Sequence, residues 1–425
     1  MKRILRHAGN MYEIASFAVN FVNKNKTKER IFHGNGSGFY GDFTLTKDLS
    51  KYTTSQFLSQ LNKKFKIAIR FSNTLSEHGT SELLRDNRGF SVRFYGENEI
   101  WDIVGLNTPI QWIDMIDDTM LFHDAMIKNT YKNSLDHTDK WNFINRTLSG
   151  FHIMTMIFSD RGIPKGWQHM NGYGCNTTSL IDKDGNRTWI KFHFKTQQGI
   201  EWYSEEEAAI ISFDYPDKMT KDMYDLINSK NFPKWKVYIQ MMEENKFKDL
   251  NYNAFSSTNI WPHADFPLIE IGEFELNQLP NDQMEEFEKI ALAPGNIPLG
   301  MGLSPDFSLT ARVDSYPRLQ QIRLGKKVNA LPPHIRKDMD LYKNNIVWLE
   351  CQNRQDEEYY YSQPRALWNL FDEGQKSRLH KNIAKALSRA DQSIIDKITN
   401  RLMRIDPEYG NGVIRELSKI NVQYN

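Results

Sequence analysis

Short segments in which apolar and polar residues alternate recur along the first two thirds of this sequence. Lys66–Ser72 (KIAIRFS) and Gly89–Tyr95 (GFSVRFY) both show the period of two that is typical of half-buried strands. Trp189–Thr196 and Trp235–Met242 add further strands, and turns and helical segments separate them. This succession predicts an α+β chain built on a closed antiparallel β-barrel with inserted helices.

Composition limits the classes of function. The 425 residues suffice for a substantial core, and 54 basic side chains against 53 acidic ones give no field that would attract nucleic acid. We find no apolar run near the ~20 residues of a membrane span and no signal-peptide pattern. Only Cys175 and Cys351 are present, which suits a reducing compartment. We therefore expect a cytoplasmic protein.

The segment Thr310–Gly325 (TARVDSYPRLQQIRLG) contains one tyrosine between two arginines. In a helix, Arg312 lies one turn before Tyr316, and Arg323, seven residues later, returns to the same face. A guanidinium beside a phenol favours the charged form, and a phenolate is a hard ligand suited to ferric iron. The same spacing also fits a surface helix that makes cation–π and ionic contacts.

A glycine-rich segment, Arg30–Phe43, precedes the first predicted strands. Gly34, Gly36 and Gly38 predict a flexible turn, and no strand–turn–helix with a following lysine supports a phosphate-binding loop. His33 lies just before these glycines, and spacing alone gives it no special role.

Several longer motifs occur together and in a fixed order. They are RIFHGNGSGFYG, RFSNTLSEHGTSELLRDNRGFSVRFYG, WDIVGLNTPI, FSDRGIPKGWQHMNGYG, KFHFKTQQGI, IWPHADFPLIEIGEFELN, GLSPDFSLTAR and then SYP and IRLG. In these motifs the chain resembles the haem-containing monofunctional catalases from about residue 28 to 326, and a weaker match follows in the C-terminal region.

The resemblance implies a set of site residues. Tyr316 is the expected proximal ligand of the haem iron, with Arg312 beside it, and His33 is the expected distal base. Ser72, together with Asn73, is expected to orient the distal imidazole. The residues expected to hold the haem propionates are Arg30, Arg70 and Arg323.

The resemblance also implies a distal asparagine, for which two positions compete. The predicted helix Asp117–Asn133 ends in TYKNSLDH, which points to Asn133, whereas counting back from Trp141 points to Asn129. We expect Asn133 because Lys132–Asn133 keeps the basic–Asn pair of the family's motif.

Four regions follow from these patterns. They are an N-terminal arm (1–29), a haem-binding β-barrel domain (30–276), an extended wrapping segment that carries the Tyr316 helix (277–357) and a C-terminal helical region (358–425). Within the last region, three amphipathic segments are expected to be helices: ALWNLFDEGQKSRLHKNIAKAL, QSIIDKITNRLMRI and GNGVIRELSKI.

The implied function is that of a haem-dependent oxidoreductase that disproportionates hydrogen peroxide through a ferryl intermediate. Haem b and a homo-oligomer, a dimer or a tetramer, are expected. NADPH binding is left open, because Ile260–His263 resembles only part of such a site. Phe32 stands where the family usually has valine, so conversion of organic or fatty-acid hydroperoxides, as in allene oxide synthases, is the alternative. A non-catalytic haem-binding relative is the third interpretation.

Overall fold

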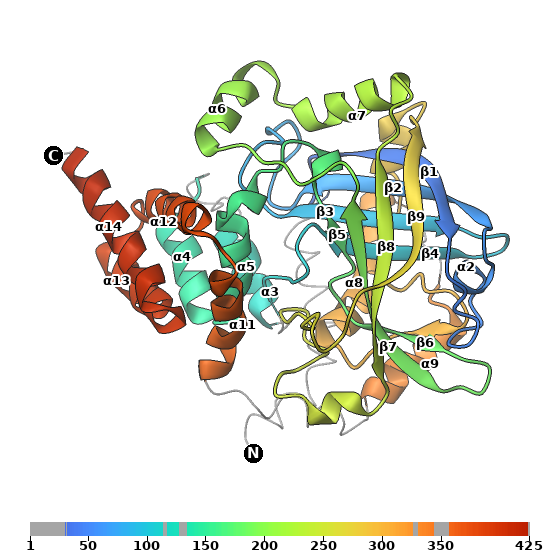
Figure 1. Ribbon diagram of the computed structural model, residues 1–425. Coiled ribbons are helices and arrows are strands. Elements are labelled where there is room, and N and C mark those ends of the chain that lie inside the picture. Colours follow the sequence, from blue (N-terminus) through green and yellow to red (C-terminus); the bar gives the residue numbers. More distant parts are fainter. Residues whose placement is uncertain are drawn as a thin grey trace.

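The fold is built on one barrel, with helices gathered mainly on one side of it (Figure 1). A computed structural model describes residues 30, 32–113, 117–126, 134–325, 330–343 and 357–423. Eight strands run antiparallel in the order β7-β5-β4-β3-β2-β1-β9-β8, and β8 pairs back with β7 to close the barrel. The expected closed antiparallel barrel in an α+β chain is therefore confirmed.

The strands vary in length from two to ten residues. Their bounds are β1 (Gly36–Leu45), β2 (Lys64–Asn73), β3 (Arg88–Tyr95), β4 (Ile100–Leu106), β5 (Gly172–Tyr173), β6 (Thr178–Ile181), β7 (Arg187–Thr196), β8 (Lys234–Glu243), β9 (Ile269–Gln278) and β10 (Met301–Gly302). Strand β6 pairs with β7 beyond the barrel, and β10 pairs with β6. Within the motif WDIVGLNTPI, strand β4 ends at Leu106.

Aromatic side chains fill the inside of the barrel. Phe71 of β2 packs edge-on against Phe90 of β3 with ring centroids 5.1 Å apart, and Phe90 stacks on Phe194 of β7 at 5.3 Å. Because successive strand residues point to opposite faces, Arg70 and Ser72 of β2 lie on the outer face. The barrel interior is a packed core, so a site built on these polar residues lies outside it.

The helices group by the part of the barrel that they accompany. Between β4 and β5 lie α3 (Asp117–Met126), α4 (His137–Arg146) and α5 (Gly150–Phe158), whereas α2 (Gln56–Ser59), α6 (Glu205–Asp214) and α7 (Lys218–Asn228) are separate insertions. After β10 come α8 (Phe307–Leu324) and α9 (Pro333–Lys343). The last helices are α11 (Glu357–Asn369), α12 (Glu373–Leu387), α13 (Gln392–Ile405) and α14 (Pro407–Gln423). Short 3-10 turns occupy Asp160–Gly162, Trp167–His169 and Lys246–Asp249, and a π-helical turn, η4, spans Met284–Glu288.

The C-terminal helices pack on α4 and α5 to form one helical body beside the barrel (Figure 1). The predicted segment ALWNLFDEGQKSRLHKNIAKAL is not one helix, because α11 ends at Asn369 and α12 starts at Glu373. The reason is local: Asp372 caps α12 by accepting from the Gln375 N–H, and the Gln375 side chain bonds back to the Asp372 N–H. Helix α9 was not predicted.

Other expectations fall partly outside the described residues. The arm 1–29 lies outside them, as do Asn129 and Asn133. The helix expected over Asp117–Asn133 is described from Asp117 to Met126. Among the described residues, no helix is long and apolar enough to cross a membrane. The four-region division stays a prediction.

Candidate active site

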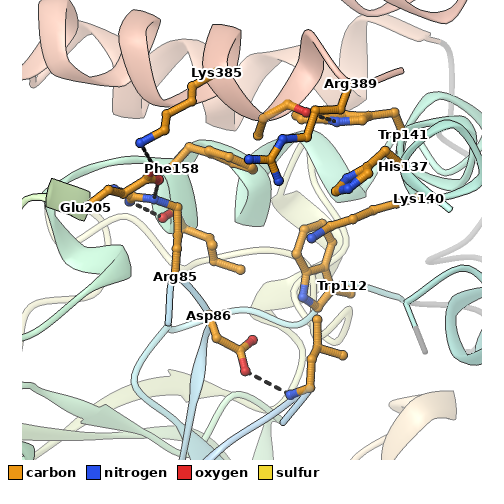
Figure 2. A pocket seen from close by; sticks show the side chains of 13 residues that line it. Arg85, Asp86, Trp112, His137, Lys140, Trp141, Phe158, Glu205, Lys385 and Arg389 are labelled. Carbon is orange, nitrogen blue, oxygen red and sulfur yellow. Dashed lines mark hydrogen bonds and ion pairs between the residues drawn. The ribbon is translucent and has the colours of Figure 1, made fainter. Parts of the chain in front are cut away.

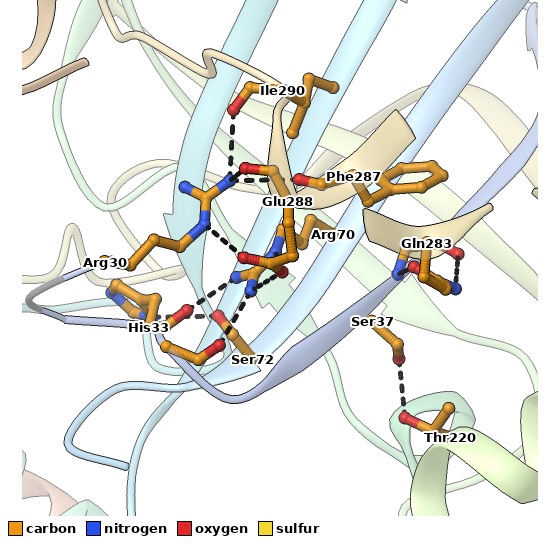
Figure 3. Close-up of polar contacts among 12 residues, drawn as sticks. Arg30, His33, Ser37, Arg70, Ser72, Thr220, Gln283, Phe287, Glu288 and Ile290 are labelled. Atoms are coloured by element: carbon orange, nitrogen blue, oxygen red, sulfur yellow. Dashed lines mark hydrogen bonds and ion pairs between the residues drawn. The ribbon is translucent and has the colours of Figure 1, made fainter. Parts of the chain in front are cut away.

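His33 is held in a fixed orientation at the entrance to β1. Its backbone has the left-handed φ of 62°, which is uncommon outside glycine and costs about 1–3 kcal/mol. The His33 N–H donates to the Thr74 carbonyl at 3.0 Å, and the Arg70 guanidinium donates to the His33 carbonyl at 2.9 Å. The ring Nδ1 lies 3.0 Å from Ser72 Oγ (Figure 3). These bonds hold the strained backbone and leave Nε2 as the ring nitrogen that can meet a substrate.

Gly89 on β3 makes room for this contact. A Cβ at Gly89 would lie 2.4 Å from Ser72 Oγ and 2.9 Å from His33 Nδ1, both too close for real atoms. Gly36 is equally confined, because its Cβ would lie 2.2 Å from the Phe71 carbonyl oxygen. The glycine at position 89 is therefore part of the geometry that joins the serine to the histidine.

Arg30 and Arg70 converge on the carboxylate of Glu288 in the turn η4 (Figure 3), and Arg323 reaches the backbone of the same residue. Arg70 donates to Glu288 Oε1 from Nη2 at 2.6 Å, and Arg30 donates to Oε2 from Nε at 3.2 Å. Arg30 also donates to the Phe287 carbonyl at 3.1 Å and to the Ile290 carbonyl at 3.2 Å. Arg323 completes the cluster by donating to the Glu288 carbonyl.

The cluster carries more positive than negative charge. Burial, then repulsion by Arg70 and Arg323, lowers the pKa of Arg30 to about 9. Burial alone would raise the pKa of Glu288, but Arg70 and Arg30 hold it below its usual value. Three guanidiniums thus face one ionised carboxylate at the outer surface of β2.

This charge also acts on His33. Burial, followed by the nearby charges of Arg70, Arg30 and Arg312, lowers the pKa of His33 to about 3. At neutral pH the imidazole is therefore uncharged and able to accept a proton. Because Arg312 belongs to α8, its effect on His33 shows that this helix and the histidine border the same region.

Helix α8 positions Tyr316 and its two arginines, as the spacing predicted. Asp306 caps its first turn by accepting from the Leu309 N–H at 3.2 Å, and Gly325 ends it with a left-handed φ of 65°. Arg312 Nη2 lies 3.3 Å from the Tyr316 hydroxyl oxygen, and its guanidinium lies 5.4 Å from the ring centroid.

The remaining contacts of Arg312 fix its position. It donates to Asn176 Oδ1 at 2.5 Å and to the Val104 carbonyl at 3.0 Å. Because these two bonds hold the Arg312 guanidinium in place, it can stabilise negative charge on the Tyr316 oxygen without moving.

The structure brings most of the sequence-predicted residues into one region. Arg30, Arg70 and Arg323 share the Glu288 turn, and Ser72 contacts His33. Arg312 contacts Tyr316 on α8.

Two neighbours of this group differ from expectation. Asn73 does not share the role of Ser72: strand alternation turns it to the other face, where it donates to the Glu82 carbonyl at 3.2 Å. Glu288 was missed, since in EEFEK it resembles a solvated acidic run. The signal was its place between the buried Phe287 and Ile290.

Solved structures with the same fold define the class of this protein. A fungal catalase superposes with a TM-score of 0.83 at 27% identity, covering 94% of this chain and 89% of that one. A bacterial catalase gives 0.82 at 28% identity, covering 96% and 90%. The chain is a catalase-type oxidoreductase.

Sequence comparison gives the family. A family model described as Catalase matches residues 13–365, and one described as Catalase-related immune-responsive matches residues 354–417. A catalase of Staphylococcus haemolyticus (strain JCSC1435) is 34% identical, and one of Staphylococcus aureus is 35% identical; each match covers 92% of this chain and 86% of the relative. The chain belongs to the catalase family, which implies a haem cofactor and decomposition of peroxide.

The charges of the site fit such a cofactor. Haem carries two propionates, and the cluster of Arg30, Arg70 and Arg323 exceeds the charge of Glu288 by two. Guanidiniums pair with carboxylates by forked hydrogen bonds and stay charged when buried. The uncharged His33 and the Arg312-bonded Tyr316 would offer such a cofactor a base and an oxygen ligand in the same region. The residues present therefore suit haem.

Proposed function

We propose that the enzyme disproportionates hydrogen peroxide, converting two molecules of peroxide into two of water and one of dioxygen. The observation that carries this proposal is His33, an uncharged imidazole fixed by Ser72 beside a cluster of cations that fits a haem. A proton acceptor held in this way is what peroxide cleavage requires. Haem, held through Tyr316 and the arginine cluster, supplies the redox chemistry of the oxygen–oxygen bond when bound.

His33 moves the proton in this scheme. Its Nε2 accepts the proton from one oxygen of the peroxide and returns it to the other oxygen of the same molecule. That second oxygen leaves as water when the oxygen–oxygen bond breaks. Ser72 fixes the ring plane and the tautomer through Nδ1. Because burial and the arginines disfavour a charged imidazole, the proton is held only briefly and returns readily.

Arg312 and the arginine cluster prepare the other side of the site. Arg312 donates to the Tyr316 oxygen and so stabilises the charge that makes it an iron ligand. Arg30, Arg70 and Arg323 would hold the propionates, and Glu288 keeps the arginines in place. We assign the hydrogen bond that holds the peroxide to Asn133, with Asn129 as the alternative position. This assignment stays a prediction, as do haem b, a homo-oligomer and a cytoplasmic location.

Conversion of organic hydroperoxides has no specific observation in its favour. This alternative requires that the Phe32 ring narrow the approach to the iron. In the structure that ring packs against Phe122 of α3, with centroids 5.8 Å apart. NADPH binding along Ile260–His263 stays a prediction from sequence.

The test uses His33→Ala with the exposed His78→Ala as control. We expect His33→Ala to keep its haem spectrum and lose about 10²–10⁴-fold in peroxide turnover per haem, the usual value of general acid–base catalysis. The wild-type rate should be flat from about pH 5 to 8, because His33 has a pKa of about 3 and stays unprotonated there. Unchanged turnover in His33→Ala, or a wild-type rate that falls with a midpoint near 6.5, would contradict the role.

A further inference from the structure

The turn that carries His33 takes part of its backbone hydrogen bonding from the β2–β3 loop (residues 74–87). The His33 N–H donates to the Thr74 carbonyl at 3.0 Å, and the Asn35 N–H donates to the Ser76 carbonyl at 3.3 Å. Because the left-handed backbone of His33 is strained, bonds from outside the turn help to keep the imidazole in place. A residue that fixes the β2–β3 loop therefore also fixes the His33 turn.

The two ends of the β2–β3 loop are bonded to each other. Asp86 accepts the Leu75 N–H at 2.8 Å (Figure 2), and the Thr74 N–H donates to the Asn87 carbonyl at 3.1 Å. A displacement of the second half of the loop is therefore passed to Thr74, which accepts the His33 N–H.

Glu82 anchors that second half. It is 2% exposed, its N–H donates to the Pro216 carbonyl at 2.9 Å, and its own carbonyl accepts from the Asn73 side chain at 3.2 Å and from Arg88 at 3.1 Å. These bonds connect the loop to β2, to β3 and to the segment before α7.

The Glu82 carboxylate caps helix α7 from a distant part of the sequence. Asp217 occupies the cap position of α7, but among the described residues its side chain makes no capping hydrogen bond. Instead Glu82 Oε2 accepts the Thr220 N–H at 2.9 Å, one of the first-turn amides that a helix cannot satisfy internally. Glu82 Oε1 accepts the Thr220 hydroxyl as well.

Thr220 also contacts the chain on the other side of His33. Its Oγ1 lies 2.8 Å from Ser37 Oγ of β1 (Figure 3), and Ser37 follows His33 by four residues. Helix α7 is therefore bonded both to the strand that leaves the His33 turn and to the loop that supports it.

The bonds between Glu82 and Thr220 persist in both protonation states. Burial raises the pKa of Glu82 to about 7, although the two bonds from Thr220 oppose this shift. As a carboxylate, Glu82 accepts both bonds. As a carboxylic acid, it accepts the Thr220 N–H and donates to Thr220 Oγ1. The flat rate expected between pH 5 and 8 is therefore retained.

We propose that Glu82 is a positioning residue, whose hydrogen bonds to Thr220 hold the β2–β3 loop and, through it, the His33 turn against α7. Glu82 acts only through the loop and touches no reacting atom. The link affects peroxide turnover because His33 is the base, and to that extent it rests on the proposed function.

Hydrogen–deuterium exchange of the purified protein tests the link at the amides of His33 and Asn35, because exchange reports local opening. Glu82→Ala should speed their exchange about tenfold or more, since two hydrogen bonds are lost. Glu82→Gln should stay within about twofold of wild type, because its amide can accept from the Thr220 N–H and donate to Thr220 Oγ1. Asp217→Ala, an exposed acid at the same helix end, is the control and should change nothing.

Peroxide turnover per haem gives the second readout. Glu82→Ala should lower it about threefold or more, and Glu82→Gln should keep it close to wild type. Thr220→Val keeps the volume of the side chain and removes its hydroxyl, so it should act in the same direction as Glu82→Ala. It also keeps the test valid if Glu82→Ala fails to fold.

Four results would overturn the positioning role of Glu82. They are exchange that quickens in α7 alone, exchange at His33 unchanged in both Glu82→Ala and Thr220→Val, turnover unaffected in both of these variants, and a Glu82→Gln variant that behaves like Glu82→Ala. A wild type without peroxide turnover would contradict the proposed function alone, since the exchange rates decide the link by themselves.

Discussion

Replacing Glu288 by glutamine removes the carboxylate on which Arg30 and Arg70 converge. The amide keeps the size of the side chain but leaves three guanidiniums without a neighbouring negative charge. Breaking a fully buried ion pair costs about 3–5 kcal/mol. Because the Glu288 side chain is 19% exposed, we expect a smaller loss in the haem-free protein, about 2–3 kcal/mol.

That loss converts into a measurable shift of the unfolding temperature. The entropy of unfolding is about 2.1 cal/mol/K per residue, which over 425 residues gives about 0.9 kcal/mol/K. Glu288→Gln should therefore lower the Tm of the haem-free protein by about 2–3 °C. In the holoenzyme the propionates supply two negative charges to the same arginines, so we expect a clearly smaller shift.

The control is Glu285→Gln on the same turn. Glu285 is 61% exposed and pairs with Lys289 at the surface, so its loss should change the Tm by less than about 1 °C. Differential scanning calorimetry of both variants, with and without haem, gives the comparison. Equal shifts for Glu288→Gln in the two forms would refute the reasoning that propionates share this cluster, and no shift in the haem-free form would refute the role of Glu288.

Two further changes probe the distal side. Gly89→Ala should separate Ser72 from His33, because the added Cβ would lie 2.4 Å from Ser72 Oγ. We expect peroxide turnover to fall at least tenfold with haem retained. Turnover equal to wild type would contradict the orienting role of Ser72. Phe32→Val should leave the ratio of hydrogen peroxide turnover to that of a bulky organic hydroperoxide unchanged, because the Phe32 ring packs against Phe122. A shifted ratio would mean that Phe32 controls access to the iron.

The barrel was predictable from local pattern, whereas the site was not. Period-two segments such as Lys66–Ser72 predicted strands because one face of each is buried in the barrel. The same rule, applied to one strand, separates Ser72 from Asn73, which had been expected to act together. The break between α11 and α12 had a local signal as well, the capping pair Asp372 and Gln375.

The arginine cluster could not be found from spacing. Arg30, Arg70 and Arg323 are separated by tens to hundreds of residues in the sequence. Only the folded chain brings them together, at Glu288 of the turn η4. Their assignment came from resemblance to a family. Glu288 was missed because the charged run around it outweighs the one local signal, its apolar neighbours Phe287 and Ile290, and tertiary packing decides whether such a residue is buried.

The most direct test of the account is the optical spectrum of the purified protein and of Tyr316→Phe. We predict one high-spin ferric haem per chain with a phenolate ligand in the wild type. Tyr316→Phe should lose the haem or hold it loosely, because phenylalanine has no oxygen to bind iron. A wild-type protein without haem, or a Tyr316→Phe variant with full haem and an unchanged spectrum, would contradict the account.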